Sequence, residues 1–144
     1  MNEEITIQKI FDMKTIAVVG LSPNEIRPSF GVAKYLQNVG YKIVPVNPGH
    51  PEILGEKSYP TLRDIPFKVD VVDVFRKPEH VTPIVEAAIE IGAKAIWFQD
   101  GVVNEEAAKL AEDAGLLVVM DDCMLREHQA MSDPNYAPHC EIKF

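Results

Sequence analysis

Short apolar runs alternate along this chain with segments whose apolar residues recur at helical spacing. The runs are nearly continuous and rich in β-branched residues, and they cover Thr15–Gly20, Lys42–Val46, Asp70–Phe75, Ala95–Phe98 and Leu116–Met120. Strands that are buried on both faces of a parallel sheet have this pattern, because helices cover both faces. We therefore predict five parallel strands.

The intervening segments predict helices that would cover the sheet. Val32, Leu36 and Val39 fall at i, i+4 and i+7, and comparable sets lie within residues 81–88 and 107–114. Each of these three segments is followed by a glycine, the residue that most often takes the position after a helix. These glycines are Gly40, Gly92 and Gly115.

The remaining segments are assigned with fewer signals. Ser29 and Asn104 are predicted N-caps, and residues 3–13 predict a short leading helix. The proline-rich stretch 47–68 is expected to wrap an edge of the sheet. Residues 121–144 show no clear period and are expected to form an irregular tail.

Strands that alternate with helices predict an α/β fold, because parallel strands need crossover connections. We expect one domain over residues 1–144, with a core of about 10–128, built as a doubly wound, Rossmann-like five-stranded parallel sheet. The predicted strand order is 3-2-1-4-5, with helices on both faces. In such folds the ligand binds at the carboxyl ends of the strands, here near the switch between the first and fourth strands.

Composition and charge narrow the class of partner. The chain has 144 residues and a net charge of −8, which argues against nucleic acid or an anionic membrane as a partner. No apolar run is long enough to span a bilayer, the acidic N-terminus lacks the apolar segment of a secretion signal, and two cysteines do not form a disulfide framework. We expect a cytoplasmic protein that binds an anionic small molecule, and a homo-oligomer remains open.

The loop after the first strand carries the strongest binding signal. Gly20 lets the backbone turn tightly, Ser22 can donate a hydroxyl, and Arg27 offers a bidentate fork to a phosphate. Ser29 then lies at the mouth of a helix, where unpaired N–H groups and the helix dipole favour anions. This arrangement predicts a phosphate site.

The second strand ends in Asn47 and Pro48, where NAD-binding domains place an acid for the ribose hydroxyl. A carboxylate here would repel a phosphorylated ribose. Its absence is compatible with a ligand that has such a phosphate, and NADP stays open on this feature alone.

The third and fourth strands add further candidates. Phe75 can flank an adenine, and Arg76 or Lys77 can reach a phosphate. Gln99 and Gly101 are expected opposite the first loop, where they can bond the amides of an extended ligand or a pyrophosphate.

The sequence predicts no catalytic residue and no metal site. No nucleophile elbow, Walker loop or compelling acid–base pair occurs. A thiol at the end of the fifth strand can meet a thiol-bearing ligand or be an inert buried side chain. A zinc site remains an alternative, although its spacing matches no compact ligand pair, and its four candidates are Cys123, His128, His139 and Cys140.

With these residues in place, the chain resembles the small stand-alone CoA-binding protein family, which is similar to the N-terminal CoA-binding domain of the succinyl-CoA synthetase α subunit. The resemblance covers about residues 10–128. Its matching pieces are Val18-Val19-Gly20-Leu21-Ser22, Arg27-Pro28-Ser29, Gly31, Gly40-Tyr41, Val46-Asn47-Pro48, Ile53-Leu54-Gly55, Asp73-Val74-Phe75-Arg76, Trp97, Gly101-Val102 and Cys123.

The resemblance implies a Rossmann-like domain that holds coenzyme A, or an acyl-CoA, through its ADP part. By this resemblance the loop 20–22 contacts the pyrophosphate, and Asn47 and Pro48 line the nucleotide side. Phe75, Arg76 and Lys77 border the adenine or the 3′-phosphate. Gln99 and Gly101 lie along the pantetheine arm.

One position departs from the family pattern, because Asp122 stands before Cys123 where the family often has a basic residue. The chain is also too short for the second domain on which the synthetase relies, so ligase activity is not expected. We expect a non-catalytic or regulatory CoA-binding protein. An NADP-dependent oxidoreductase or a CoA-dependent transferase is the alternative.

Overall fold

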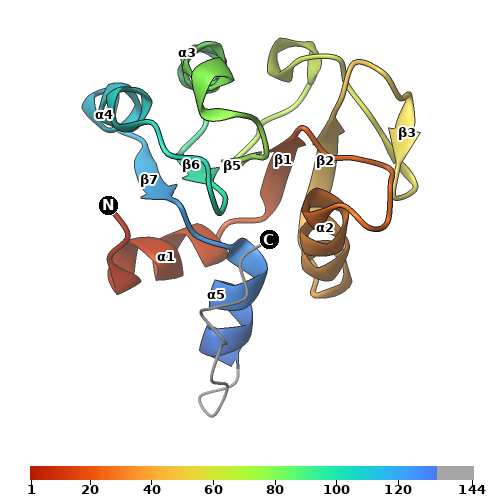
Figure 1. The fold of residues 1–144 in the computed structure, drawn as a ribbon, viewed down its shortest axis with the longest axis horizontal. Helices are drawn as coiled ribbons and strands as arrows, with labels where there is room; N and C mark the ends of the chain where they lie inside the picture. Colours follow the sequence, from red (N-terminus) through yellow and green to blue (C-terminus); the bar gives the residue numbers. More distant parts are fainter. Residues whose placement is uncertain (133–144) are drawn as a thin grey trace.

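A computed structural model describes residues 1–132 and shows a five-stranded parallel sheet between two layers of helices (Figure 1). The strands are β1 (Thr15–Val19), β2 (Lys42–Val46), β5 (Val71–Val74), β6 (Ala95–Phe98) and β7 (Leu117–Met120). Every pairing among them is parallel. The predicted α/β, doubly wound fold class is confirmed.

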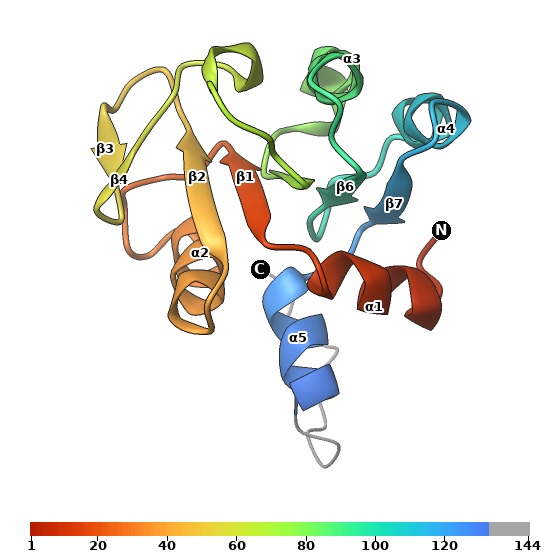
Figure 2. The same ribbon diagram turned by 180° about the vertical axis from the view of Figure 1, so that it is seen from behind.

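Helices cover both faces of this sheet, as Figure 2 shows from behind. One face carries α3 (Thr82–Glu90) and α4 (Glu105–Asp113). The other carries α1 (Glu4–Phe11), α2 (Pro28–Asn38) and α5 (Met124–Ser132). None of the helices in the described part of the chain is long and apolar enough to cross a membrane.

The strand side chains alternate between two apolar cores, one under each layer of helices. In β1, Ala17 and Val19 face the core below α3 and α4, whereas Ile16 and Val18 face the core below α1, α2 and α5. This alternation follows from the period of two along a strand. Burial on both faces explains the continuous apolar runs in the sequence.

The predicted strand order is wrong at one position. The sheet runs β2-β1-β5-β6-β7, so the third major strand lies between β1 and β6 instead of beyond β2. The outer edge of β2 is occupied by residue Tyr59, which pairs with Val46 and exchanges backbone hydrogen bonds with Pro45 and Asn47 at 3.0 and 2.9 Å. The predicted wrapping of the edge by residues 47–68 is thereby confirmed, and the switch point lies between β1 and β5.

This wrapping stretch contains short regular pieces. They are the antiparallel pair β3 (Glu52–Ile53) and β4 (Glu56–Lys57), followed by the 3-10 turn η1 (Leu62–Asp64). A second 3-10 turn, η2 (Pro78–His80), precedes α3.

The helix boundaries agree with the sequence at most positions. The Asn104 side chain caps α4 by accepting a hydrogen bond from the Ala107 N–H at 3.0 Å, and the leading helix is α1. The prediction that Ser29 caps α2 is wrong, because this helix begins at Pro28, with Arg27 as its N-cap. The glycines predicted after the three helices all have positive φ: Gly40, Gly92 and Gly115.

The tail from residue 121 is not irregular throughout, because Met124–Ser132 form α5. Burial in α5 is concentrated at its first turn, where Met124 follows the buried Cys123, so no repeating apolar face marks the helix. The His128 ring instead anchors it, with its Nδ1 atom 2.7 Å from the Tyr35 hydroxyl and its ring edge-on to Phe11.

Candidate functional site

A cavity of about 680 Å³ opens at the carboxyl ends of the strands around the switch point. All predicted site residues except Asn47 and Pro48 line it. Its lining comprises Gly20, Ser22, Arg27, Pro28, Ser29, Val32, Phe75, Arg76, Lys77, Pro78, Gln99, Asp100, Gly101, Val102 and Cys123. The topology thus gathers residues from the ends of β1, β5, β6 and β7 around one space, as expected for parallel strands.

The loop after β1 is held tightly against β5. Gly20 has φ +88°, and a Cβ atom at this position would lie 2.3 Å from the carbonyl oxygen of Phe75. Only glycine fits this close approach without displacing the backbone. The Ser22 N–H donates to the buried Ser29 hydroxyl at 3.0 Å, so Ser29 joins the loop to the first turn of α2.

Three cations line the cavity without an anionic partner. Arg27 precedes α2, and Arg76 and Lys77 follow β5. None of the three side chains forms an ion pair or a side-chain hydrogen bond within residues 1–132. In a chain of net charge −8, this local excess of positive charge favours an anionic ligand.

The end of β2 lies outside this cavity. The Asn47 amide donates to the Leu21 carbonyl at 2.9 Å, and its Oδ1 atom accepts from the Gly49 N–H at 2.8 Å. Asn47 therefore positions the loop after β1, a role that its place in the sequence did not indicate.

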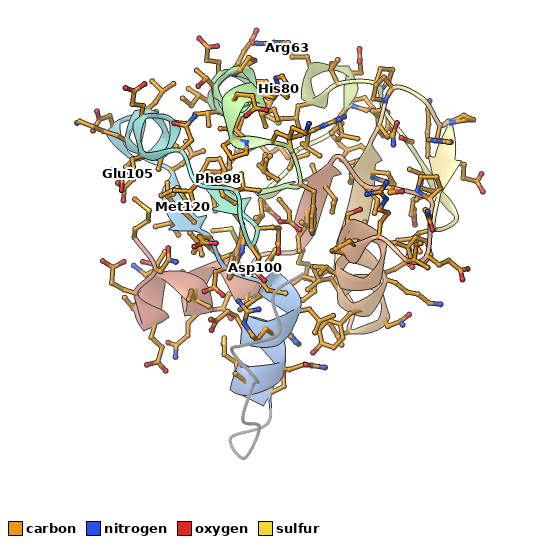
Figure 3. The ribbon with its side chains drawn as sticks, viewed as in Figure 1. Arg63, His80, Phe98, Asp100, Glu105 and Met120 are labelled. Carbon is orange, nitrogen blue, oxygen red and sulfur yellow. The ribbon has the colours of Figure 1, made fainter. Side chains whose placement is uncertain are left out.

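Pro48 lines a second cavity of about 340 Å³, on the side of the sheet that α3 covers. Arg76 lines both cavities, so the two spaces flank this side chain. Apolar and prolyl side chains dominate the second cavity, and Arg63 and His80 stand on the α3 side of the molecule (Figure 3).

A buried polar pair lies beneath the first cavity. The Asp73 carboxyl is fully buried, and its Oδ1 atom accepts a hydrogen bond from the Gln99 amide. Burial raises the pKa of Asp73 to about 7, against the opposing effect of the hydrogen bonds from Gln99 and the Val74 N–H. No role was predicted for Asp73, although a single acid inside an otherwise apolar strand is a usable signal.

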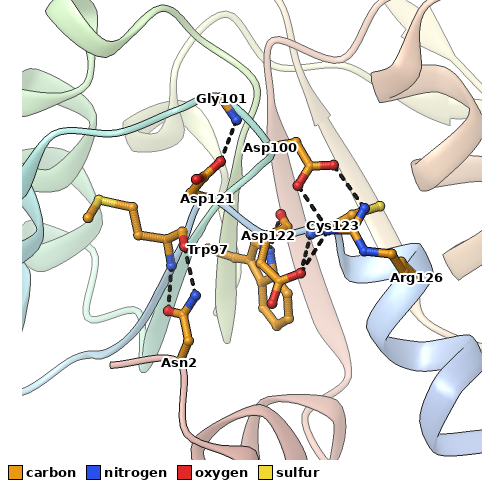
Figure 4. Close-up of polar contacts among 9 residues, drawn as sticks. Asn2, Trp97, Asp100, Gly101, Asp121, Asp122, Cys123 and Arg126 are labelled. Atoms are coloured by element: carbon orange, nitrogen blue, oxygen red, sulfur yellow. Dashed lines mark hydrogen bonds and ion pairs between the residues drawn. The ribbon is translucent and has the colours of Figure 1, made fainter. Parts of the chain in front are cut away.

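The far side of the cavity is a corner of paired charges (Figure 4). Arg126 donates to both carboxylate oxygens of Asp100 at 3.0 Å and to Asp122 at 3.1 Å. The departure at Asp122 thus has a structural explanation, because its carboxylate pairs with Arg126. Trp97 is fully buried beside this corner and donates to the Asp122 carbonyl at 2.9 Å, so it serves the packing of the sheet.

Cys123 lies within this corner and lines the cavity. Its side chain is buried, and burial raises the pKa of the thiol above its ordinary value, with Arg126 acting in the opposite direction. The thiol is therefore protonated at neutral pH.

Of the four zinc candidates, His139 and Cys140 lie outside the described residues. Within residues 1–132, no group of three or more His, Cys, Asp or Glu side chains is placed to hold a metal ion.

Fold and cavity together define an α/β domain of the Rossmann-like class with a cavity at its switch point. Residues 14–129 match the family model of the CoA binding domain, so the chain belongs to the CoA binding domain family. The resemblance recognised in the sequence is thereby confirmed.

Several known proteins are similar to this chain over most of its length. The uncharacterized protein YneT of Bacillus subtilis is 43% identical over 115 residues, covering 80% of this chain and 85% of YneT. A solved structure of a hypothetical protein from Pyrococcus horikoshii OT3 superposes with a TM-score of 0.87 at 44% identity, covering 92% of this chain and 94% of the other.

A larger relative includes a similar segment. The ADP-forming acetate–CoA ligase I of Archaeoglobus fulgidus is 28% identical over 128 residues, which cover 82% of this chain but 19% of the ligase. The chain therefore corresponds to about a fifth of that enzyme.

Proposed function

We propose that this protein binds coenzyme A, or an acyl-CoA, through its ADP part and acts as a non-catalytic or regulatory CoA-binding protein. The observation that carries this proposal is the cluster of Arg27, Arg76 and Lys77, three cations around one cavity at the switch point that have no anionic partner within residues 1–132. CoA has a pyrophosphate and a 3′-phosphate, so it requires positive charge at separate points. Membership of the CoA binding domain family supports the same ligand.

The two cavities fit an elongated ligand that passes Arg76. In this arrangement the pyrophosphate lies at the Gly20 loop and the N-terminal end of α2, where Arg27 can form a bidentate contact. The nucleoside lies toward Pro48 and Phe75, with Arg76 or Lys77 at the 3′-phosphate. The pantetheine arm then runs along Gln99 and Gly101 toward Cys123.

Binding without turnover accounts for the state of the titratable groups around the cavity. The Asp100 carboxylate is held by Arg126, and Asp73 is buried beneath Gln99. The Cys123 thiol is protonated at neutral pH because its pKa is raised. A general base needs an accessible, unpaired group within reach of its substrate, and these three lack that property.

NADP is the second candidate ligand, with an oxidoreductase as the corresponding function. The observation that favours it is the neutral Asn47 at the end of β2, together with Arg76 and Lys77, which suit a phosphorylated ribose. CoA and NADP differ in the position of this phosphate, so direct binding measurements separate them.

Isothermal titration and thermal shift with CoA, dephospho-CoA and NADP test the proposal, using protein shown by mass spectrometry to be free of co-purified ligand. A ligand at about 100 times its Kd should stabilise the fold by about 2.7 kcal/mol. We expect the largest shift with CoA and a smaller one with dephospho-CoA. Absence of a shift with CoA would overturn the proposal, and a larger shift with NADP would favour the alternative.

A further inference from the structure

Asp73 is the next-to-last residue of β5, close to the carboxyl end of the sheet, and the residues around it are apolar. Its neighbours in register are Val18 on β1 and Trp97 on β6, both members of the core below α1, α2 and α5. Within residues 1–132, the Gln99 amide donates the side-chain hydrogen bond to the Oδ1 atom of Asp73. The Oδ2 atom of Asp73 has no hydrogen-bond partner there.

Packing alone does not explain an acid at this position. The other residues of β5 are Val71, Val72 and Val74, all fully buried, and a valine at 73 would continue the same surface. Burying a carboxyl group costs free energy when one of its oxygens has no hydrogen-bond partner. Such a conflict between local environment and residue type is expected where function requires it.

The hydrogen bond between Asp73 and Gln99 fixes the orientation of the Gln99 amide, which has a donor N–H group at one end and an acceptor oxygen at the other. Its Nε2 atom donates to Asp73, whereas its Oε1 atom has no partner in the described part of the chain. Gln99 is 3% exposed and lines the cavity. An acceptor without a partner at a cavity wall points to a ligand group that would satisfy it.

Ionised Asp73 can only accept hydrogen bonds, so it requires the donor end of the Gln99 amide. The acceptor end is then directed to the cavity side of the pair. A partner that offered both a donor and an acceptor would permit either orientation of this amide.

We infer that Asp73 is a positioning residue that orients Gln99, so that the cavity accepts a hydrogen bond from an N–H or S–H donor of the ligand. This inference rests on the proposed function, under which the donors are the amide N–H groups and the thiol of the pantetheine arm. Asp73 thereby sets the polarity that the cavity presents to this arm.

Titration calorimetry at about pH 8 tests the inference by comparing CoA with adenosine 3′,5′-bisphosphate, which lacks the arm. Asp73→Asn replaces the carboxylate by an amide that can donate or accept. We expect it to weaken CoA binding about fivefold and to leave bisphosphate binding unchanged. A purely structural role would affect both ligands equally.

The double variant Asp73→Asn/Gln99→Glu exchanges the amide and the carboxylate, so that the new amide at position 73 can donate to position 99 and an oxygen again faces the cavity. We expect it to recover most of the lost CoA affinity. Asp113→Asn on α4, an exposed position, is the matched control and should leave both ligands unaffected. Thermal melts of each variant establish that it folds.

S-methyl-CoA identifies the donor. Affinity equal to that of CoA assigns the hydrogen bond to an amide N–H, and weaker affinity assigns it to the thiol; both results support an acceptor at the cavity wall. If Asp73→Asn weakens both ligands equally, or neither, the inference is overturned while CoA binding stands. If the unmodified protein fails to bind CoA, the proposed function and the inference both fall.

Discussion

Charged side chains are paired on one side of the cavity and unpaired on the other. On the side of β7 and α5, Arg126 is paired with Asp100 and Asp122, and the side chains of the first pair are 14% and 6% exposed. On the side of β1 and β5, Arg27 and Arg76 have no anionic partner in the described residues, and the buried Asp73 has no cation there.

This difference distinguishes charged groups that stabilise the fold from charged groups that are available to a ligand. Buried charges that serve the fold are matched by their neighbours, because an unmatched buried charge is costly. Groups left unmatched around a cavity instead have their hydrogen-bonding and charge capacity available for a ligand. The contrast therefore favours the β1–β5 side of the cavity for the proposed ligand, with α5 closing the other side.

The largest expected effect concerns the pH dependence of stability through Asp73. Its folded-state pKa is about 7, above the ordinary aspartate value of 3.8, so the folded protein keeps a proton that the unfolded chain releases. Stability therefore falls as pH rises from about 4 to about 7 and then levels off. The full shift corresponds to roughly 4 kcal/mol.

Asp73→Asn removes this titration. We expect the stability advantage of the variant over the unmodified protein to grow by a few kcal/mol between about pH 4 and about pH 8, as measured by urea unfolding. Comparison of the two proteins cancels other titrating groups, such as Glu127, whose pKa is raised to about 7 mainly by burial. A constant difference across this range, as expected for Asp113→Asn, would show that Asp73 does not titrate in this way.

Arg126→Ala tests the paired side of the cavity. It removes Arg126 from the part-buried carboxylates of Asp100 and Asp122, which should lower the free energy of unfolding by about 2–4 kcal/mol. Lys109→Ala breaks an exposed pair with Asp113 and should cost about 0.5 kcal/mol or less. Equal losses in chemical denaturation would contradict the distinction between buried and exposed pairs.

Gly20→Ala tests the close approach of the loop after β1 to the end of β5. The new methyl group would meet the Phe75 carbonyl, and the backbone has φ +88°. We expect a loss of about 2–3 kcal/mol in stability and a marked loss of CoA binding. Gly31→Ala, which meets no atom within 4 Å, is the control and should be neutral or stabilising. Unchanged CoA affinity in a folded Gly20→Ala protein would argue against the loop as a phosphate site.

Arg27→Ala tests the unpaired side with the least effect on the fold. Because Arg27 has no partner to lose within residues 1–132, we expect little change in Tm but roughly tenfold weaker CoA binding in titration calorimetry. Trp97→Phe, a change within the core, should affect Tm more and affinity less. The reverse order of affinities would show that the cationic cluster is not the phosphate site.

The local features of the fold were predictable from residue patterns. Continuous apolar runs indicated the strands, helical spacing indicated α2, α3 and α4, and Asn104 was recognised as a cap. Most of the candidate residues at the strand ends line the first cavity, because the carboxyl ends of parallel strands meet at one edge of the sheet. The strands and helices follow from burial and period, and the cap follows from the hydrogen-bonding capacity of the Asn104 side chain.

Other features escaped prediction for identifiable reasons. The contact of the Asn47 amide with the Leu21 carbonyl was not foreseen, because it depends on the path of a loop distant in sequence. The α5 helix was missed because its burial is confined to one end. The pairing of Asp73 with Gln99 was not predicted, because an apolar run with one polar residue still has the pattern of a buried strand.

The amino-acid order of this chain is enough to specify the five strands of the main sheet, the helices α1 to α4 and which residues stand at the strand ends. It does not specify that β5 inserts beside β1, that Arg126 is neutralised while Arg27 is not, or that Asp73 meets Gln99. Periodicity records whether a residue is buried, a property of its own segment. Pairing between segments depends on the path of the connections between strands. Because the strands have similar apolar compositions, no local feature of a strand indicates its neighbours in the sheet.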